Sequence, residues 1–208
     1  AMAATGGSSD AATAGVEESK AAGGAAIANV GSVAARQGAA SMVEDAMGAW
    51  GRVDILINNA GILRDKSFAK MELDDFQVVL DVHLMGSVNV TREVWPIMRE
   101  QNYGRIVMTT SPSGLYGNFG QTNYGAAKLG LVGFMNTLKI EGARNNIHTN
   151  AIAPVAATRM TENLIPEGAQ KALGPELVTP AVVYLCTGDA PNGVIMQAQG
   201  GRFSVACV

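Results

Sequence analysis

The sequence of 208 residues predicts an α/β fold in which helices cover both faces of a parallel sheet. Two observations predict it. Short apolar segments, each about as long as a buried strand, alternate along the chain with longer segments whose apolar residues recur at helical spacing. The two kinds of segment follow one another at the short intervals of β-α-β units. The chain is long enough for a sizeable core and shows no repeat or linker, so we expect a single domain over residues 1–208.

Five apolar segments have the length and composition of strands. The clearest is VDILIN at 53–58, whose nearly continuous apolar residues are typical of a strand buried on both faces. The weakest is AAIANV at 25–30. We expect these two strands to pair, because an unpaired edge at 53–58 would expose backbone amide and carbonyl groups. The predicted strands lie near residues 25–30, 53–58, 104–109, 147–152 and 194–198.

Apolar residues at helical spacing predict the helices between these strands. The Ala/Gly/Ser-rich start of the chain contains one possible short helix. Pro96 is expected to end the long helix that begins near Glu72, because proline lacks the amide hydrogen that a helix interior needs. The predicted helices lie near residues 11–22, 34–50, 72–95, 123–138 and 180–187.

Composition excludes several classes of function. The net charge is −3 and no Lys/Arg cluster occurs, which argues against a nucleic-acid surface. No apolar run approaches the ~20 residues of a membrane span. The two cysteines, Cys186 and Cys207, form no CxxC pair, and we predict no metal site. Without a secretory leader or a peroxisomal Ser-Lys-Leu ending, the expected location is cytoplasmic.

The stretch from Tyr103 to Gly130 carries the candidate chemistry. A strand is followed by a Gly/Ser/Asn-rich loop and then by a helix that begins near Asn123. Ser111 lies just beyond the carboxyl end of the strand, where ligands bind in open α/β sheets. Tyr124 and Lys128 are four residues apart, so they lie on one helix face, one turn from each other.

These three side chains suit proton exchange with an alcohol or carbonyl oxygen. A phenol has an ordinary pKa near 10, and a neighbouring ammonium is expected to lower that pKa. Ser111 is able to hold the substrate oxygen by a hydrogen bond while a hydride moves elsewhere. Most Tyr and Lys residues at this spacing are ordinary surface residues of a helix, so the interpretation depends on the surrounding sequence.

The surrounding sequence resembles the short-chain dehydrogenase/reductase family. Ser111, Tyr124 and Lys128 match its catalytic pattern. The resemblance is closest to the (3R)-hydroxyacyl-CoA dehydrogenase part of peroxisomal multifunctional enzyme type 2 and to its bacterial single-domain relatives. It extends from about residue 22 to 170 and is carried by three runs, NNAGILRDKSFAKM (58–71), GLYGNFGQTNYGAAKLGLVGF (114–134) and IAPVAATRMTENLIPEG (152–168).

The resemblance implies a Rossmann-like three-layer sandwich and a set of site residues. Tyr124 is then the acid/base, Lys128 holds the nicotinamide ribose, and Ser111 orients the substrate oxygen. His83 occupies the position where many members carry a fourth catalytic residue, an Asn, although a lone His on a helix is more often a packing residue. The implied cofactor is NAD or NADP, and its implied contacts are Asn58, Ala60, Gly61, Tyr124, Lys128, Pro154 and Thr158.

The same resemblance implies the substrate and the partners. The substrate is a small acyl-CoA-like molecule, either a 3-hydroxyacyl thioester or a similar secondary alcohol. Residues 162–175 are expected to form a mobile substrate lid. A homodimer or homotetramer is expected through the helices at 84–95 and 124–144, whose small residues permit close packing.

The sequence departs from the family at its start. The family opens with a strand, a glycine-rich turn for the dinucleotide phosphates, a helix and a second strand. Residues 1–24 show none of these, so we interpret them as a degenerate or truncated nucleotide-binding half. One hypothesis is therefore a dehydrogenase that is weak or inactive as this chain. The alternatives are a non-catalytic structural or oligomerisation module and, without positive support, a cofactor-free lyase or hydratase.

Overall fold

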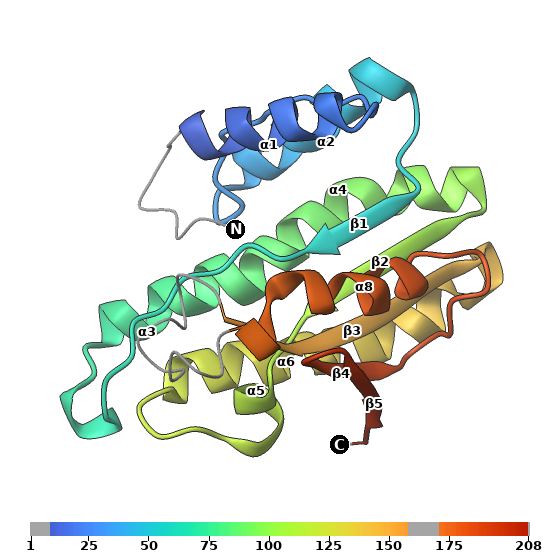
Figure 1. Ribbon diagram of the computed structural model, residues 1–208. Helices are drawn as coiled ribbons and strands as arrows, with labels where there is room; N and C mark the ends of the chain where they lie inside the picture. Colours follow the sequence, from blue (N-terminus) through green and yellow to red (C-terminus); the bar gives the residue numbers. More distant parts are fainter. Residues whose placement is uncertain (1–8, 158–170, 208) are drawn as a thin grey trace.

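The computed structural model describes residues 9–157 and 171–207, and its centre is a five-stranded sheet (Figure 1). The strands follow their chain order, β1-β2-β3-β4-β5. The first four are parallel, and β5 runs antiparallel to β4 after a turn at Gly200 and Gly201. The predicted α/β fold is confirmed. The strands are β1 (Ile55–Asn58), β2 (Gly104–Thr109), β3 (Ile147–Val155), β4 (Ile195–Gln199) and β5 (Arg202–Ala206).

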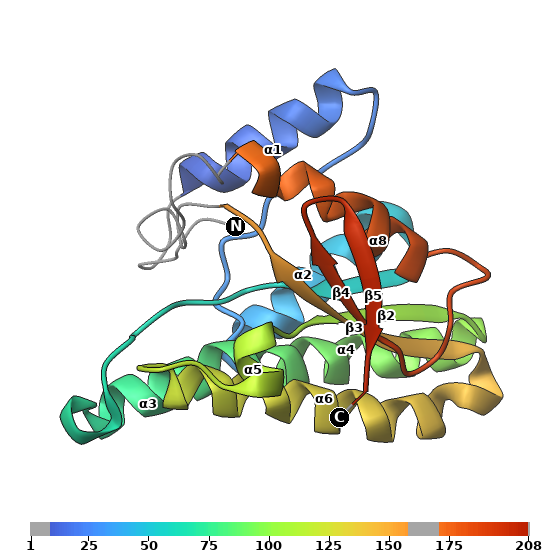
Figure 2. The ribbon, with the colours of Figure 1, turned by 60° about the horizontal axis from the view of Figure 1, so that its bottom comes forward.

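Helices cover both faces of this sheet (Figure 2). Helices α4 and α6 lie on one face, and α8 lies on the other. Helix α2 packs on α4, and side chains of α2 line a pocket together with β1 (Figure 1). The helices are α1 (Ser9–Ala21), α2 (Arg36–Trp50), α3 (Leu73–Leu80), α4 (Gly86–Gln101), α5 (Pro112–Tyr116), α6 (Thr122–Gly142) and α8 (Thr179–Leu185). A π-helical segment, η2 (Asp81–Met85), joins α3 to α4, and 3₁₀ turns occupy 68–70, 143–145, 171–173 and 175–177.

The core follows from the apolar character of β2, the second strand, all of whose residues are buried. Ile106 and Met108 pack against the α4 and α6 side, and Val107 packs beneath α8. Alternate residues of a strand face opposite sides of a sheet, so one apolar strand supplies both layers of the core. Within the described residues, no helix is long and apolar enough to cross a membrane.

The predicted strand at 25–30 is wrong, and so is its pairing with 53–58. Residues 24–32 contain no strand, and the side chains of Ile27 and Val30 are exposed. Asn29 explains the local conformation. Its Oδ1 accepts from the amide of Gly31 at 2.7 Å, and its Nδ2 donates to Asp45 on α2 at 2.7 Å. A side chain that satisfies nearby groups in this way competes with strand pairing.

Two other expectations need correction. Pro96 does not end the long helix, because α4 continues to Gln101 with Pro96 in its interior. Pro96 and Arg92, whose carbonyl loses its helical partner, both lie on the exposed side, where water is able to solvate that carbonyl. The antiparallel strand β5 (202–206) was not among the five predicted strands.

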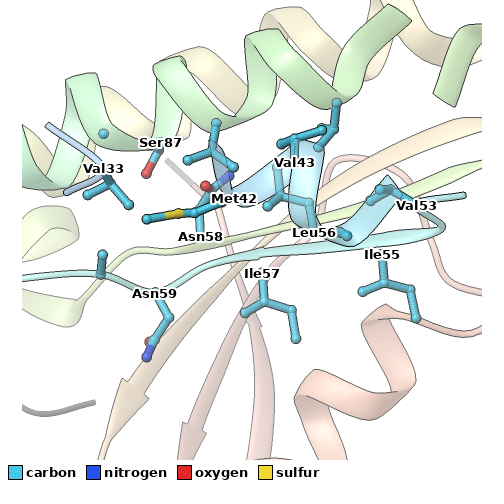
Figure 3. A pocket seen from close by; sticks show the side chains of 15 residues that line it. Val33, Met42, Val43, Val53, Ile55, Leu56, Ile57, Asn58, Asn59 and Ser87 are labelled. Atoms are coloured by element: carbon cyan, nitrogen blue, oxygen red, sulfur yellow. The ribbon is translucent and has the colours of Figure 1, made fainter. Parts of the chain in front are cut away.

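Strand β1 is an edge strand, and it carries apolar side chains on both faces. Among the described residues β2 is its only neighbour in the sheet. Ile55 and Ile57 are each 46% exposed. Figure 3 shows these two side chains pointing away from α4, whereas Leu56 points toward it. A pocket of about 260 Å³ lies between β1, α2 and α4, and it is lined mainly by apolar side chains such as Val33, Met42 and Val43.

Candidate functional site

The candidate site residues lie where β1 and β2 end. Asn58 is the last residue of β1, and Thr109 is the last residue of β2. Ser111 caps the N-terminus of α5 and is buried. Its Oγ accepts from the amide of Ser113 at 3.2 Å. The parallel register places these strand ends on one edge of the sheet, and the first turns of α6 pack against α5 and carry Tyr124 and Lys128 to the same edge.

Lys128 is a buried amine without an acidic partner among the described residues. Its side chain is 3% exposed, and Nζ donates a short hydrogen bond to the carbonyl oxygen of Thr109. No ion pair of the described residues involves it. Burial disfavours the ammonium form and lowers the pKa of Lys128 to about 7. The hydroxyl of Thr110 donates to the Lys128 carbonyl at 2.7 Å, which ties α6 to the end of β2.

Tyr124 lies beside Lys128, but its pKa moves in the opposite direction from the expected one. The Lys128 Nζ is 5.4 Å from the centre of the phenol ring. Burial raises the pKa of Tyr124, and the charge of Asp65 raises it further, whereas a hydrogen bond with Ser111 lowers it. The expected lowering by Lys128 is absent. Desolvation of the phenolate dominates, and an amine with a pKa of about 7 is only partly charged at neutral pH.

His83 is buried against Tyr124. The two rings meet edge to face, with centroids 5.1 Å apart. His83 Nε2 lies 2.8 Å from the carbonyl oxygen and 3.0 Å from the amide nitrogen of Ile62. Burial, aided by the charge of Lys128, lowers the pKa of His83 to about 4, so the ring is neutral near pH 7. Within the described part of the chain, Nδ1 is buried without a hydrogen-bond partner.

The π-helical segment η2 places His83 at this position. A π turn adds one residue to a helical turn, and such turns occur frequently at functional sites. The hydroxyl of Ser87 donates to the His83 carbonyl at 2.7 Å and satisfies a backbone acceptor at this irregular point. The loop after β1 then closes over the imidazole. A Cβ on Gly61 would lie 2.3 Å from His83 Cε1, so this loop can approach the ring only because residue 61 is glycine.

The other residues predicted to bind the cofactor have different surroundings. Asn58 is buried, and its amide donates to Thr91 Oγ1 at 3.1 Å and to Met108 Sδ at 3.3 Å, so it braces β1 against its neighbours. Ala60 is exposed, and with Asn58 it lines one end of the pocket beside β1. That pocket does not include Ser111, Tyr124 or Lys128.

The remaining predicted contacts are Pro154 and Thr158. Pro154 is half-buried and is the penultimate residue of β3. Thr158 lies outside the described residues, and so does most of the predicted lid at 162–175. The described end of that range, from Lys171, forms two short 3₁₀ turns.

Asn123 was not predicted to belong to the site. It directly precedes Tyr124 and is fully buried, with hydrogen bonds to three other residues. The available signal was the position of an Asn in the first turn of a helix, where its side chain commonly satisfies backbone amides.

The described residues fit one part of a nicotinamide dinucleotide. Lys128 offers an ammonium with three N–H donors and has one acceptor among the described residues, which suits it to bind ribose hydroxyls. The unpartnered His83 Nδ1 also leaves a polar atom beside Tyr124 for another group. Within residues 9–157 and 171–207, however, no glycine-rich turn links a strand to a helix N-terminus, the usual geometry for pyrophosphate.

Comparisons with known proteins agree on the family. The model of the short chain dehydrogenase family matches residues 1–169. A short-chain type dehydrogenase/reductase of Mycobacterium tuberculosis is 53% identical over 179 residues, which cover 86% of this chain and 63% of that protein. Peroxisomal multifunctional enzyme type 2 of Mus musculus is 52% identical over 190 residues, which cover 91% of this chain and 25% of the enzyme.

A solved structure shows the same likeness in three dimensions. The crystal structure of a short chain dehydrogenase from Mycobacterium avium matches with a TM-score of 0.85 and 37% identity. The match covers 94% of this chain and 69% of that one. Of the two curated relatives above, the chain spans less than two thirds of the length of each.

Proposed function

Because the chain belongs to the short-chain dehydrogenase family, we propose that it is the catalytic part of an NAD(P)-dependent oxidoreductase acting on a 3-hydroxyacyl thioester or a similar secondary alcohol. The observation that carries the proposal is the meeting of Ser111, Tyr124 and a buried Lys128 at one edge of the sheet, where Lys128 has no acidic partner among the described residues. The thioester is proposed from the resemblance of the three sequence runs to hydroxyacyl-CoA dehydrogenases.

Tyr124 performs the proton transfer in this proposal. Its raised pKa keeps the phenol protonated at neutral pH, so it is ready to donate to the carbonyl oxygen of a ketone substrate. Ser111 holds the same oxygen by a second hydrogen bond. A bound nicotinamide would supply the hydride in reduction and accept it in oxidation. For alcohol oxidation Tyr124 must first lose its proton, so we expect the oxidation rate to rise with pH.

Lys128 and His83 have separate roles in the proposal. Lys128 binds the ribose and, with a pKa of about 7, is able to exchange protons near neutral pH. His83 stays neutral and orients the site, because its Nε2 holds Ile62 and its ring contacts Tyr124. The cofactor side of the cleft is shaped by Asn58, Ala60 and Gly61. The nicotinamide is contacted by Pro154 and Thr158 in this proposal.

We further propose a single domain with weak cofactor affinity in the 208-residue chain. The described residues include Lys128, the proposed ribose contact, but form no phosphate-binding turn, and positioning is worth on the order of 7–11 kcal/mol of a reaction barrier. The open edge of β1 favours a second candidate, a structural module that associates through unpaired surfaces. Helix α6 supports a homodimer or homotetramer, since Leu129 and Ile140 are exposed along it.

A titration of the purified chain with NADH and NADPH tests the proposal, with nicotinamide fluorescence as the signal. Saturable binding that Lys128→Ala weakens would support it. The matched control is Lys139→Ala, on the same helix but away from the site, which is expected to leave binding unchanged. Tyr124→Phe should abolish turnover of an acetoacetyl thioester while preserving cofactor binding. Absence of binding at millimolar NADH and NADPH would favour the structural module.

A further inference from the structure

Asn123 joins three segments of the site through one buried side chain. Its Oδ1 accepts from the backbone amide of Tyr124 at 2.7 Å. Its Nδ2 donates to the carbonyl oxygens of Arg64 at 3.0 Å and Asp75 at 3.3 Å. An Asn amide has two N–H donors and one carbonyl acceptor, so both N–H groups and the oxygen have partners. The first turn of α6 is therefore fastened both to the loop after β1 and to α3.

Two further contacts join the same segments. Gln121 is buried, and its Nε2 donates to Asp65 Oδ2 at 2.7 Å. The backbone amide of Lys66 donates to the carbonyl of Gly120 at 2.9 Å. Residues 64–66 continue the segment in which Ile62 holds His83, so the contacts of α6 and those of the imidazole share one support.

A simple helix cap does not account for these bonds. A side chain that caps a helix N-terminus needs only its acceptor oxygen, which satisfies a free backbone amide. The two bonds from Nδ2 of Asn123 lead instead to the loop after β1 and to α3, both remote in sequence. Their consequence is tertiary, because they fix where the first turn of α6 lies.

We propose that Asn123 is a positioning residue for Tyr124, which it holds at contact distance from His83 by fastening the first turn of α6 to residues 64–66 and to α3. The consequence for catalysis rests on the proposed function, in which Tyr124 is the acid/base. The hydrogen bonds of Asn123 among the described residues do not reach the phenol hydroxyl or the predicted ribose ligand Lys128, so it acts through the backbone of Tyr124.

The phenol pKa of Tyr124 reports its position independently of turnover. The titratable and charged groups that face it are Lys128 on its own helix, His83 on η2 and Asp65 on the loop after β1. Burial is the largest of the influences and raises this pKa. A phenol that moves outward gains water, and its pKa then falls toward the ordinary value near 10.

The experiment compares Asn123→Ala and Asn123→Ser with the control Asn145→Ala. Asn145 lies beyond the far end of α6, where its amide donates to Asn102 Oδ1 at 3.2 Å. Tyrosinate absorbance is followed with pH, and the curve of the same variant carrying Tyr124→Phe is subtracted to isolate Tyr124. We expect Asn123→Ala to lower the phenol pKa, Asn123→Ser to lower it less, and Asn145→Ala to leave it unchanged.

Turnover provides the second measurement. Misplacing a catalytic group by about 1 Å costs roughly 100-fold, so kcat should fall by about that factor in Asn123→Ala with little change in the KM for the nucleotide. An unchanged phenol pKa in folded Asn123→Ala would overturn the positioning role. If circular dichroism shows that Asn123→Ala does not fold, an unchanged phenol pKa of Tyr124 in Asn123→Ser would likewise overturn the positioning role. An inactive wild-type chain would count against the proposed function alone, because the pKa comparison needs no turnover.

Discussion

Lys128 is the residue whose surroundings most affect the chemistry of the site. Its Nζ is buried, and among the described residues it has one carbonyl acceptor and no ion-pair partner. Desolvation therefore lowers the pKa of Lys128 to about 7, and the same effect raises the pKa of Tyr124. Near neutral pH the Lys128 amine therefore loses its proton readily, whereas the Tyr124 phenol retains its proton. That pairing favours proton donation to a carbonyl.

Lys128 should also make stability depend on pH. Its pKa is about 7 in the folded chain and 10.5 in its unperturbed state, so between these values the unfolded chain binds the extra proton. The free energy of unfolding should therefore rise from pH 7 to 10.5, by up to about 1.4 kcal/mol per pH unit. The stability that neutral Lys128 contributes decreases as the pH falls through this range and is lost below the folded pKa of about 7. Urea unfolding at several pH values measures this slope.

The variant Lys128→Met removes the titrating amine while filling its space. Its unfolding free energy should lack the rise that wild type shows between pH 7 and 10.5. Lys139→Met, on the same helix, should retain that rise. Equal slopes in wild type and Lys128→Met would contradict the burial of a titrating Lys128.

At the level of single elements, β1 is an edge strand whose apolar side chains are partly exposed. Ile55 and Ile57 are half-exposed, and the sheet continues only on the β2 side among the described residues. Parallel strands are normally covered on both faces, and unpaired edges invite pairing with other chains. The expectation that 25–30 would cover this edge was wrong because Asn29 bonds to Gly31 and to α2 instead.

The edge of β1 should therefore promote self-association. Ile57→Lys introduces a charge at the exposed edge and should lower the average mass that light scattering measures at a fixed protein concentration. Val183→Lys provides the control, since Val183 is also exposed but lies on helix α8. An equal decrease in both variants would attribute association to general surface hydrophobicity, and no decrease in Ile57→Lys would exclude the edge as its cause.

At the scale of the whole molecule, Arg105 connects the amino-terminal end of β2 to two distant loops. The side chain is buried, and its guanidinium donates to the carbonyls of Thr187 at 2.9 Å, Gly188 at 2.8 Å and Asn146 at 2.9 Å. It also stacks over the ring of Tyr103 at 4.4 Å. These contacts lie at the edge opposite the candidate site, so they support the fold without entering the chemistry.

Loss of Arg105 should destabilise the whole chain. In Arg105→Met the carbonyls of Thr187, Gly188 and Asn146 lose a charged donor, and a hydrogen bond to a charged group contributes about 1.5–3 kcal/mol, so we expect a total loss of about 3 kcal/mol or more. Chemical denaturation measures the change. Arg99→Met, at the exposed end of α4, should change stability by less than about 0.5 kcal/mol. A similar small change for Arg105→Met would show that water replaces the guanidinium.

The sequence by itself determined the α/β class and four of the five strands, and its resemblance to the short-chain dehydrogenases selected Ser111, Tyr124 and Lys128 as a candidate set. The strands depend on local periodicity, because an apolar segment is a property of neighbouring residues. The tertiary structure alone decided that 25–30 is not a strand, that His83 bonds Ile62, and that Asn123 fastens α6. It also decided the direction of the pKa of Tyr124. Burial and long-range hydrogen bonds depend on which distant segments meet, and local patterns do not encode that.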